Sequence, residues 1–322
     1  MGESIFMSEE KFEKERKKEE NFVGLSNSRQ KGTNFDSNVL ISVDRITVIG
    51  VPKLSGGADT GTFMRVIYQK WKKESFFKLT TAGNIINPDT DENIAYFEVP
   101  QHQQDKIRVD YNPKRLREEP YSEWATALRW LLNQLQDKRF SRLDIAFDMV
   151  NLDVKGYQPY IFGASRTIYM TRAWKVGSIY AGARGSKLQI RFYDKKLERK
   201  ANHEELDCDS YWRLEMQLRG SKTKTWYDDC RKKLDKFYRI DPHGVTSLRD
   251  KITLLAIKQD EKILAELSIN YRKKFRKLMQ KPDNQDRTVT LKLLECLEEN
   301  KQKIVDELES YLDEFYIKTS QT

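Results

Sequence analysis

Tyr193 is the residue of this chain whose type and neighbours best suit covalent chemistry on a phosphate. Residues 188–194 read Leu-Gln-Ile-Arg-Phe-Tyr-Asp and alternate between apolar and polar side chains, as a half-buried strand does. The apolar residues of this segment share one face, whereas Arg191, Tyr193 and the following Lys195 share the other. A tyrosine would normally join the apolar row, but here it stands between two cations. This placement suits a tyrosine whose oxygen has to meet a phosphate.

Four acidic residues fall on predicted strands whose polar faces could coincide with the face of Tyr193. They are Asp110, Asp144, Asp148 and Glu215. Carboxylate oxygens suit a hard cation, so convergence of these faces would form a site for Mg²⁺ or Mn²⁺. The chain therefore has the residue types for a metal-assisted attack of a tyrosine on a phosphodiester.

Spacing along the strand limits which of these carboxylates can share one ion. Asp144 and Asp148 are four residues apart, which is about 13 Å in a regular strand. We therefore expect Asp144 to be the ligand and Asp148 to support it. An ordinary solvated face of an antiparallel sheet would carry the same residue types. On that interpretation Arg191 would pair with Glu215 or Asp110 across the sheet.

The sequence has few of the motifs that other catalytic chemistries require. The 3 histidines form no HxH or HxxxH pair, and the chain has neither a P-loop nor a dinucleotide-binding fingerprint. The glycines of Gly182-Ala183-Arg184-Gly185 suit a hairpin turn better than a phosphate cradle. The 3 cysteines form no CxxC pair, which favours a reducing compartment, and no stretch approaches a membrane span. We therefore expect a cytosolic protein that neither enters a membrane nor uses zinc.

The composition indicates a folded protein with a negatively charged partner. Hydrophobic residues make up 38% and aromatic residues 11% of the 322 residues, which is too much for a disordered chain. A formal charge of +9 favours nucleic acid as that partner. Many alternating segments with few helices between them predict an α+β fold around an antiparallel sheet. The predicted strands are 39–43, 46–49, 64–69, 93–99, 106–111, 142–150, 187–194 and 211–219, and Trp124, Leu128, Leu131, Leu132 and Leu135 follow helical spacing.

The character of the chain changes along its length, and we expect three parts. Residues 1–38 are rich in Lys and Glu and predict a mobile arm or, at most, a solvated helix. Residues 39–245 predict the catalytic domain, and residues 246–322 predict a helical region. Within the last part, residues 271–281 predict a basic helix without any acid. Its cations would contact DNA phosphates, or would merely lie on a solvated face. They are Arg272, Lys273, Lys274, Arg276, Lys277 and Lys281.

A heptad spacing of apolar residues follows this basic helix. It runs through Leu294, Leu297, Ile304, Leu308, Tyr311 and Phe315, with Lys301 as a polar interruption. Such a seam suits the contact of a homodimer, and it equally suits an amphipathic helix that folds onto its own domain.

Several short strings extend the pattern around Tyr193 over most of the chain, from about residue 25 to near its end. They are Ser26-Asn27-Ser28-Arg29, Arg108-Val109-Asp110-Tyr111-Asn112-Pro113, Arg142-Leu143-Asp144-Ile145-Ala146-Phe147-Asp148, Tyr180-Ala181-Gly182, Ile190-Arg191-Phe192-Tyr193-Asp194-Lys195-Lys196, Trp212-Arg213-Leu214-Glu215 and Trp226-Tyr227-Asp228-Asp229-Cys230. In type and order they resemble the motifs of the Rep_trans family, the replication initiators of staphylococcal-type rolling-circle plasmids.

The resemblance implies a defined reaction. An initiator of this kind binds a double-strand origin and nicks one strand at an extruded hairpin, and the catalytic tyrosine of the family falls on Tyr193. The phenolate would attack the phosphodiester, leave a 5′-phosphotyrosine and a free 3′-hydroxyl, and rejoin the strand after synthesis. Since a free tyrosine has a pKa of about 10, Arg191, Lys195 and a bound Mg²⁺ or Mn²⁺ would favour the anion. The implied fold is a HUH-like nuclease domain without the paired histidines, followed by a helical region.

The resemblance also implies partners. A host superfamily 1 helicase would unwind the DNA, and a host DNA polymerase would extend the 3′-hydroxyl. Only Tyr193 fits the nucleophile position, so a second cleavage would need the other subunit of a homodimer or a water molecule.

Three other interpretations stay open. A relaxase or initiator of an integrative conjugative element would keep the same chemistry. A DNA-binding regulator would keep the fold and lack the reaction. A metal-dependent nuclease that uses water would cleave DNA without becoming attached to it.

Overall fold

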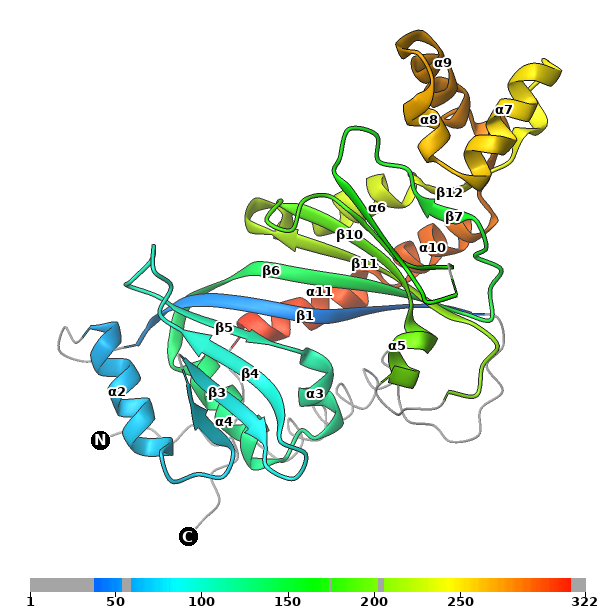
Figure 1. Cartoon of the computed structure of the whole chain (residues 1–322). Helices are drawn as coiled ribbons and strands as arrows, with labels where there is room; N and C mark the ends of the chain where they lie inside the picture. The colour runs from blue at the N-terminus through cyan, green and yellow to red at the C-terminus, as the bar shows by residue number, and fades with distance from the viewer. Residues whose placement is uncertain (1–37, 54–58, 81, 174, 202–205, 314–322) are drawn as a thin grey trace. The chain divides into compact units, whose positions relative to one another are not determined.

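The computed structural model describes residues 38–53, 59–80, 82–173, 175–201 and 206–313 (Figure 1). The chain divides into two compact units: unit 1 contains residues 41–145 and the segment from 302 onward, and unit 2 contains residues 146–301 with a short segment that ends at Leu40. The predicted boundaries at residues 38 and 245 stay predictions, and the predicted arm up to residue 37 lies outside the described residues. Within the described ranges, no helix combines the length and the apolar character needed to span a membrane.

Unit 1 is built on antiparallel strands in the order β2-β3-β4-β5-β1-β6. These strands are β1 (Asn38–Pro52), β2 (Phe77–Leu79), β3 (Gly83–Asn87), β4 (Glu92–Glu98), β5 (Ile107–Tyr111) and the part of β6 (Leu135–Val150) that ends at Ile145. The helices of this unit are α2 (Thr60–Trp71), α3 (Pro113–Glu118), α4 (Glu123–Asn133) and α11 (Lys301–Leu312).

The helix predicted around Trp124 is α4. Its first turn is capped by Ser122, whose Oγ accepts a hydrogen bond from the Ala125 N–H at 3.3 Å. The predicted apolar stripe from Trp124 to Leu132 is buried, because it faces the sheet. Leu135 was predicted to end this stripe, but it begins β6 instead.

Unit 2 carries a second set of antiparallel strands in the order β6-β11-β10-β9-β8, and a small sheet in the order β13-β12-β7. The strands are β7 (Tyr157–Pro159), β8 (Arg166–Met170), β9 (Val176–Ala181), β10 (Leu188–Asp194), β11 (Tyr211–Arg219), β12 (Phe237–Ile240) and β13 (Gln285–Asp286). The helices are α5 (Lys195–Ala201), α6 (Trp226–Leu234), α7 (Leu248–Gln259), α8 (Lys262–Glu266), α9 (Ile269–Met279) and α10 (Thr288–Glu299), with short 3₁₀ turns at Gly220–Thr223, Pro242–Gly244 and Pro282–Asn284.

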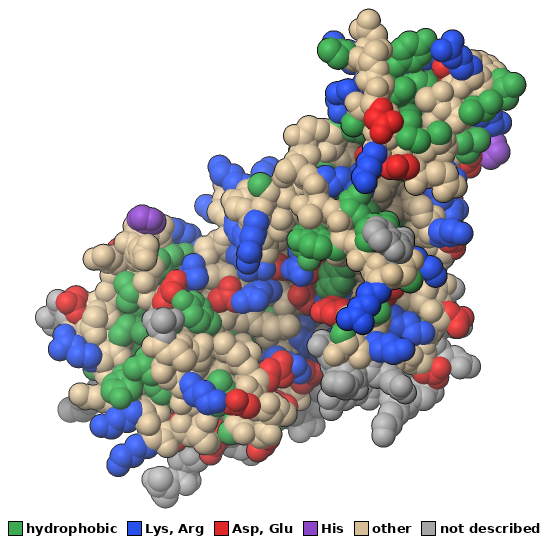
Figure 2. All heavy atoms as spheres, viewed as in Figure 1, with side chains coloured by type: hydrophobic (Ala, Val, Ile, Leu, Met, Phe, Trp, Pro, Cys, Tyr) green, Lys and Arg blue, Asp and Glu red, His purple; other side chains and the backbone are tan. Residues whose placement is uncertain are grey.

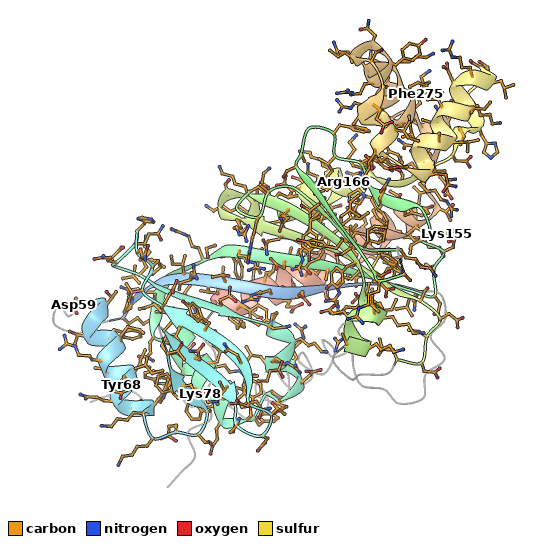
Figure 3. The ribbon with its side chains drawn as sticks, viewed as in Figure 1. Asp59, Tyr68, Lys78, Lys155, Arg166 and Phe275 are labelled. Atoms are coloured by element: carbon orange, nitrogen blue, oxygen red, sulfur yellow. The ribbon has the colours of Figure 1, made fainter. Side chains whose placement is uncertain are left out.

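Helices α7, α8 and α9 form a helical cluster beside β12 and β7 (Figure 1). Phe275 and Met279 of α9 are buried against Leu254 of α7, Leu264 of α8 and Tyr238 of β12. Phe275 points into the middle of this group (Figure 3). The helical cluster therefore has an apolar core of its own, and the predicted basic helix at 271–281 appears as α9, which ends at Met279.

The predicted α+β class is confirmed, because helices accompany a large antiparallel sheet. The predicted strands at 93–99, 106–111, 187–194 and 211–219 appear as β4, β5, β10 and β11, 142–150 forms the second part of β6, and the two predicted segments at 39–49 join into β1.

The strand predicted at 64–69 is wrong, because these residues lie in α2. Asp59 caps this helix: its Oδ1 accepts a hydrogen bond from the Thr62 N–H at 2.7 Å. The buried residues Phe63, Ile67 and Trp71 recur every four positions, which is the spacing of one helical face. The β-branched pair at 66–67 favoured a strand locally, but the cap and the buried face determine a helix.

The predicted seam at 294–315 is not one continuous helix. It is interrupted at Asn300, between α10 and α11, where the Asn300 Nδ2 donates a hydrogen bond to the Cys296 carbonyl at 2.9 Å. Leu297, Ile304 and Leu308 are each buried in the single chain, and Phe315 lies outside the described residues. These side chains therefore serve the fold of a single chain, and the homodimer stays a prediction without this seam.

Candidate active site around Tyr193

Strand β10 places Tyr193 on the polar face of the unit 2 sheet. Ile190 and Phe192 are 0% and 3% exposed, whereas Tyr193 is half-buried. The antiparallel registers place Arg213 of β11 and Ser178 of β9 opposite Tyr193. Residues that pair in register point to the same face of a sheet, so these three side chains form one row across the polar face.

The chain enters β10 through a turn that requires glycine. Gly182 has a φ of +97°, in the left-handed region, and a Cβ there would lie 2.8 Å from the Leu188 carbonyl oxygen. The Gln189 Nε2 donates a hydrogen bond to the Gly182 carbonyl at 3.0 Å. The turn predicted at 182–185 is therefore present, and it leads into the register that sets Arg191 opposite Tyr180.

Two cations flank the ring of Tyr193. The Arg191 Cζ lies 5.7 Å and the Lys195 Nζ lies 5.6 Å from the centroid of this ring. At such distances a cation is attracted to the electron-rich face of an aromatic ring. Lys195 is the first residue of α5, and the Asp194 Oδ1 accepts a hydrogen bond from the Leu197 N–H at 2.9 Å. The strand therefore passes directly into the helix, and local backbone geometry holds both cations near the phenol.

The charge of Lys195 is sensitive to its surroundings. Its side chain is only 8% exposed, and its Nζ lies 2.7 Å from the Glu198 carboxylate. Burial, and then the charge of Arg213, lower the pKa of Lys195 from its ordinary value of 10.5. Burial acts in the same direction on Arg191, but the Glu215 carboxylate together with Tyr193 and Tyr180 outweighs it and raises the pKa of Arg191. Arg191 therefore keeps its charge, whereas Lys195 loses its proton at a lower pH than a free lysine.

The two unit 2 carboxylates that were predicted as metal ligands are paired with arginines. The Glu215 Oε1 accepts a hydrogen bond from the Arg191 Nη1 at 2.8 Å, which is the alternative pairing that the sequence left open. Asp148 accepts two hydrogen bonds from Arg213, one from Nε at 2.6 Å and one from Nη2 at 2.8 Å. Asp148, Glu215 and Arg213 are almost completely buried. Charged groups at such depth are stable only when they are paired, so these ion pairs stabilise the sheet around Tyr193.

The two unit 1 carboxylates are also engaged. Asp110 accepts hydrogen bonds from the Arg45 Nε at 2.6 Å and the Thr47 Oγ1 at 2.7 Å, and Asp144 accepts one from the Arg142 Nε at 2.8 Å. Among the described residues, no three His, Cys, Asp or Glu side chains come together as a metal-binding group. The four predicted ligands therefore do not fit a resident Mg²⁺ or Mn²⁺ in this arrangement, since guanidinium groups engage their oxygens. The cation stays a prediction.

The cations of α9 that were predicted to contact DNA divide into two groups: the arginines make contacts within the helical cluster, and the lysines line a pocket. The Arg272 Nη2 donates a hydrogen bond to the Ala265 carbonyl at 2.6 Å, and the Arg276 Cζ lies 5.6 Å from the centroid of the Phe162 ring. Both arginines therefore support the helical cluster. The lysines line an open pocket of about 440 Å³, whose residues are Asn270, Lys273, Lys274, Lys277, Leu278 and Lys281.

The pocket on α9 follows a helical face that was not predicted as a unit. The five lining residues within α9 are spaced three, one, three and one positions apart, so they lie on one side of the helix, and Lys281 follows its end. This spacing could have added Asn270 and Leu278 to the predicted set. The Lys274 Nζ also pairs with the Asp250 carboxylate at 2.6 Å. Figure 2 shows Lys and Arg side chains exposed over the helical cluster.

Two further residues complete the surroundings of Tyr193, and neither of them was predicted to have a role. Arg213 lies opposite Tyr193, and the Arg191 Cζ lies 5.7 Å from the centroid of the Tyr180 ring. Alternation along the strand places Arg213 on a polar face, but it does not show which residue of β10 lies opposite. That relationship depends on the register between strands.

The fold and the site together define an α+β protein that carries a cation-flanked tyrosine on an antiparallel sheet. No family model matches the chain. The chain is similar to several proteins named Replication initiation protein from Staphylococcus aureus. One is 26% identical over 303 residues, which cover 91% of this chain and 92% of that protein. Another is 28% identical over 295 residues, which cover 88% and 90%.

Two more similarities are shorter or weaker. A third Replication initiation protein from S. aureus is 28% identical over 211 residues, and this match spans 65% of this chain and 65% of that protein. A solved structure of the rolling circle replication initiator protein from Geobacillus stearothermophilus aligns with a TM-score of 0.39 and 15% identity. That alignment covers 62% of this chain and 86% of the other.

Proposed function

We propose that this chain initiates rolling-circle replication of a circular DNA by nicking one strand at the origin with Tyr193. The similarity to replication initiation proteins over 91% of the chain supports the role in initiation. One observation carries the chemistry: the Tyr193 ring stands between the Arg191 and Lys195 cations on the polar face of the sheet. A phenol in these surroundings is suited to attack a phosphodiester.

In the proposed reaction the Tyr193 Oη attacks the phosphorus of the scissile phosphate. A new oxygen–phosphorus bond forms while the bond from phosphorus to the 3′-oxygen breaks. The phenol proton leaves to solvent and the 3′-oxygen takes up a proton, so that the products are a free 3′-hydroxyl and a 5′-phosphotyrosine. Because one phosphate ester replaces another, the reverse reaction can rejoin the strand without ATP.

Three cations of this chain would support that attack. Arg191 and Lys195 favour the phenolate over the phenol, and they attract the phosphate that must come within reach. Glu215 holds one edge of the Arg191 guanidinium, which orients it beside the ring. Arg213, held by Asp148 and opposite Tyr193 in register, adds a fixed positive charge. The Mg²⁺ or Mn²⁺ requirement belongs to the proposal as a prediction only.

The remaining parts of the proposal are predictions from the sequence and from its resemblance to the Rep_trans family. The catalytic domain would be a HUH-like nuclease that lacks paired histidines, and the lysines of the α9 pocket would contact origin DNA beside an extruded hairpin. A host superfamily 1 helicase and a host DNA polymerase would act after the nick, in the cytoplasm. A second subunit of a homodimer, or a water molecule, would make the second cleavage.

The test is to trap the covalent product. A supercoiled plasmid that carries this gene is incubated with the protein and Mg²⁺ or Mn²⁺, the DNA is digested, and the protein is searched by mass spectrometry for an attached nucleotide. We expect the adduct on Tyr193 and its loss in Tyr193→Phe. The matched control is Tyr121→Phe, since Tyr121 lies outside this site and is 72% exposed.

Each other outcome of this experiment would indicate a different function for this chain. Nicking without an adduct would indicate a nuclease that uses water. DNA binding with neither nick nor adduct would indicate a regulator. An adduct formed only on the transfer origin of a conjugative element would indicate a relaxase.

A further inference from the structure

We propose that Tyr169 and Tyr180, together with Arg191, form a stacking platform for unpaired bases beside Tyr193. The ligand would be single-stranded DNA on one side of the scissile phosphate. This inference rests on the proposed function, because it assigns a substrate-binding surface to the same site. The site as described above accounts for the phosphate only, and a nicking protein must also hold the nucleotides next to it.

Strand register places the platform on the face of Tyr193. Tyr193 lies opposite Ser178 of β9, and Ser178 lies opposite Tyr169 of β8. In the neighbouring row, Arg191 lies opposite Tyr180. Partners in register share a face, so the three tyrosines and Arg191 all stand on the polar side of the sheet. Strands are about 4.8 Å apart, and the platform therefore extends about 10 Å from Tyr193 toward the edge strand.

The side chains of the platform contact one another in a continuous series. The Arg191 Cζ lies 5.7 Å from the ring centroids of both Tyr193 and Tyr180, so the guanidinium stands between the two rings. The rings of Tyr180 and Tyr169 are 5.4 Å apart, at an interplanar angle of 74°. Aromatic rings and arginine planes of this kind are the groups on which single-stranded nucleic acids stack their bases.

Exposure indicates that the outer end of the platform is available to a ligand. β8 is the last strand in its sheet order, and Tyr169 is 57% exposed while Tyr180 is partly buried. On the opposite face, Ile168 of β8 is 44% exposed, whereas Ile179 opposite it in β9 is 2% exposed and belongs to the core. Tyr169 therefore places a large, mostly exposed ring on the face of Tyr193, outside the apolar core.

The charge of this part of the chain favours nucleic acid over a protein partner. Residues 154–193 contain seven Lys or Arg residues and no Asp or Glu, although acids are common elsewhere in the chain. These residues are Lys155, Arg166, Arg172, Lys175, Arg184, Lys187 and Arg191. Arg166, which begins β8 (Figure 3), pairs with Glu261, and Arg191 pairs with Glu215, so the other five cations carry the excess positive charge. A positively charged surface that carries exposed aromatic rings is the general pattern of single-strand binding.

The bases have to be unpaired for this arrangement to work. Stacking on a side chain needs a free base face, which a duplex offers only at its ends, so the platform should discriminate between single-stranded and double-stranded DNA. Stacking is also tolerant of sequence, because every base has an aromatic face. The platform should therefore hold the strand near Tyr193 while other contacts select the origin.

The experiment measures DNA binding apart from cleavage. In a Tyr193→Phe background, fluorescence anisotropy compares a 5′-fluorescein 16-mer of mixed sequence with its duplex. Tyr169→Ala and Tyr180→Leu test the platform, Tyr169→Phe keeps the ring, and Ile168→Ala is the matched control on the opposite face of β8. We expect each loss of a ring to weaken single-strand binding about 5- to 100-fold. Tyr169→Phe and Ile168→Ala should stay within about twofold, and duplex binding should change little.

Three results would overturn the platform while leaving the nicking reaction untouched. Single-strand binding by Tyr169→Ala could equal that of the parent protein, Ile168→Ala could lose as much, or duplex binding could fall to the same extent. A change of oligomeric state in Tyr169→Ala with unchanged DNA binding would also overturn it, because β8 would then be a protein contact. Conversely, if the ring variants lose single-strand binding while the protein with Tyr193 intact forms no adduct in the plasmid assay, the platform is supported and the proposed nicking reaction is removed.

Discussion

Arg213 donates two hydrogen bonds to Asp148 while lying opposite Tyr193 in strand register. The donor atoms Nε and Nη2 are 2.6 and 2.8 Å from the carboxylate oxygens, and the two side chains are 2% and 3% exposed. The charge of Arg213 contributes to the lowered pKa of Lys195, so this buried pair influences a cation beside the phenol. A carboxylate that was predicted to support a metal ion thus holds an arginine in place instead.

Replacing Asp148 tests whether this pair is structural. Asp148→Asn would leave the Arg213 charge buried without its counter-charge, and we expect the free energy of unfolding to fall by about 3–5 kcal/mol. Urea denaturation followed by circular dichroism measures this. As a control, Asp105→Asn alters a side chain that is 69% exposed and should cost less than about 0.5 kcal/mol. A loss below about 1 kcal/mol for Asp148→Asn would show that the pair contributes little.

The lowered pKa of Lys195 predicts a pH dependence of nicking. As the pH rises toward 10.5, Lys195 loses its charge earlier than an ordinary lysine, and its support of the phenolate is lost with it. An arginine at this position would keep its charge throughout. The ratio of the Lys195→Arg nicking rate to the wild-type rate should therefore increase between pH 7 and 10, and Lys195→Gln should be slow at every pH. A ratio that does not change with pH would contradict the prediction, provided that the melting temperatures of the variants match.

Each of the four carboxylates that were predicted to bind a metal ion is paired with an arginine, and we therefore expect the DNA-free protein to bind Mg²⁺ weakly. Because Asp110, Asp144, Asp148 and Glu215 each accept hydrogen bonds from an arginine, 10 mM Mg²⁺ should raise the melting temperature of the DNA-free protein by less than about 1 °C. Differential scanning calorimetry with and without EDTA measures the shift. A rise of several degrees that disappears in Glu215→Gln would show instead that this carboxylate binds the ion. The requirement of nicking itself for a cation is tested separately, by adding EDTA to the plasmid assay.

The lysines on α9 predict a salt-dependent affinity for DNA. Lys273 and Lys277 line the pocket of about 440 Å³, and each phosphate contact that is lost should reduce the slope of log K against log salt by about 0.9. The double variant Lys273→Gln, Lys277→Gln should therefore bind origin DNA more weakly and with a slope lower by about 2. The control double variant Lys232→Gln, Lys292→Gln removes the same charge from α6 and α10. Equal slopes for the two double variants would mean that net charge, and not this pocket, determines the binding.

Because the pKa of Asp286 is lowered in the folded protein, we expect acid to destabilise the region around β12 and β13. Burial would raise the pKa of Asp286, but hydrogen bonds from Tyr157, the Thr288 N–H and Arg239 lower it well below its usual range. The carboxylate thus stabilises the folded state fully above about pH 4 and loses this effect as the pH falls toward its folded pKa. The difference in unfolding free energy between wild type and Asp286→Asn should be large at pH 7 and smaller at pH 3. A difference that is the same at both pH values would contradict this account.

Local patterns were sufficient for the strands that carry the site. In β10 and β11 one face is core and the other is polar, so the period of two in the sequence is strong and the bounds were predicted within a residue. The prediction failed at α2, where a β-branched pair resembles a strand locally while Phe63, Ile67 and Trp71 form the buried side of a helix. It also failed at Asn300, because a heptad spacing continues through a helix break without any change in apolar pattern.

The identity of the carboxylate partners was not predictable from the spacing of the acids. Acids on the polar faces of neighbouring strands suggested a shared cation, and the arginines on the same strands were equally compatible with ion pairs. The choice depends on which side chains lie opposite one another, and Arg191 lies opposite Glu215. A one-residue change of register would have sent the same side chains to different faces.

The sequence by itself determined that Tyr193 stands on a polar face between two cations, because alternation along a strand and the start of the next helix are local properties of the backbone. Only the tertiary structure decided that Arg213 holds Asp148, and that Tyr180 and Tyr169 continue the row of rings from Tyr193. These contacts join residues up to 65 positions apart. They form only when turn lengths and core packing have set the registers of β8, β9, β10 and β11, and no local pattern in the sequence contains that information.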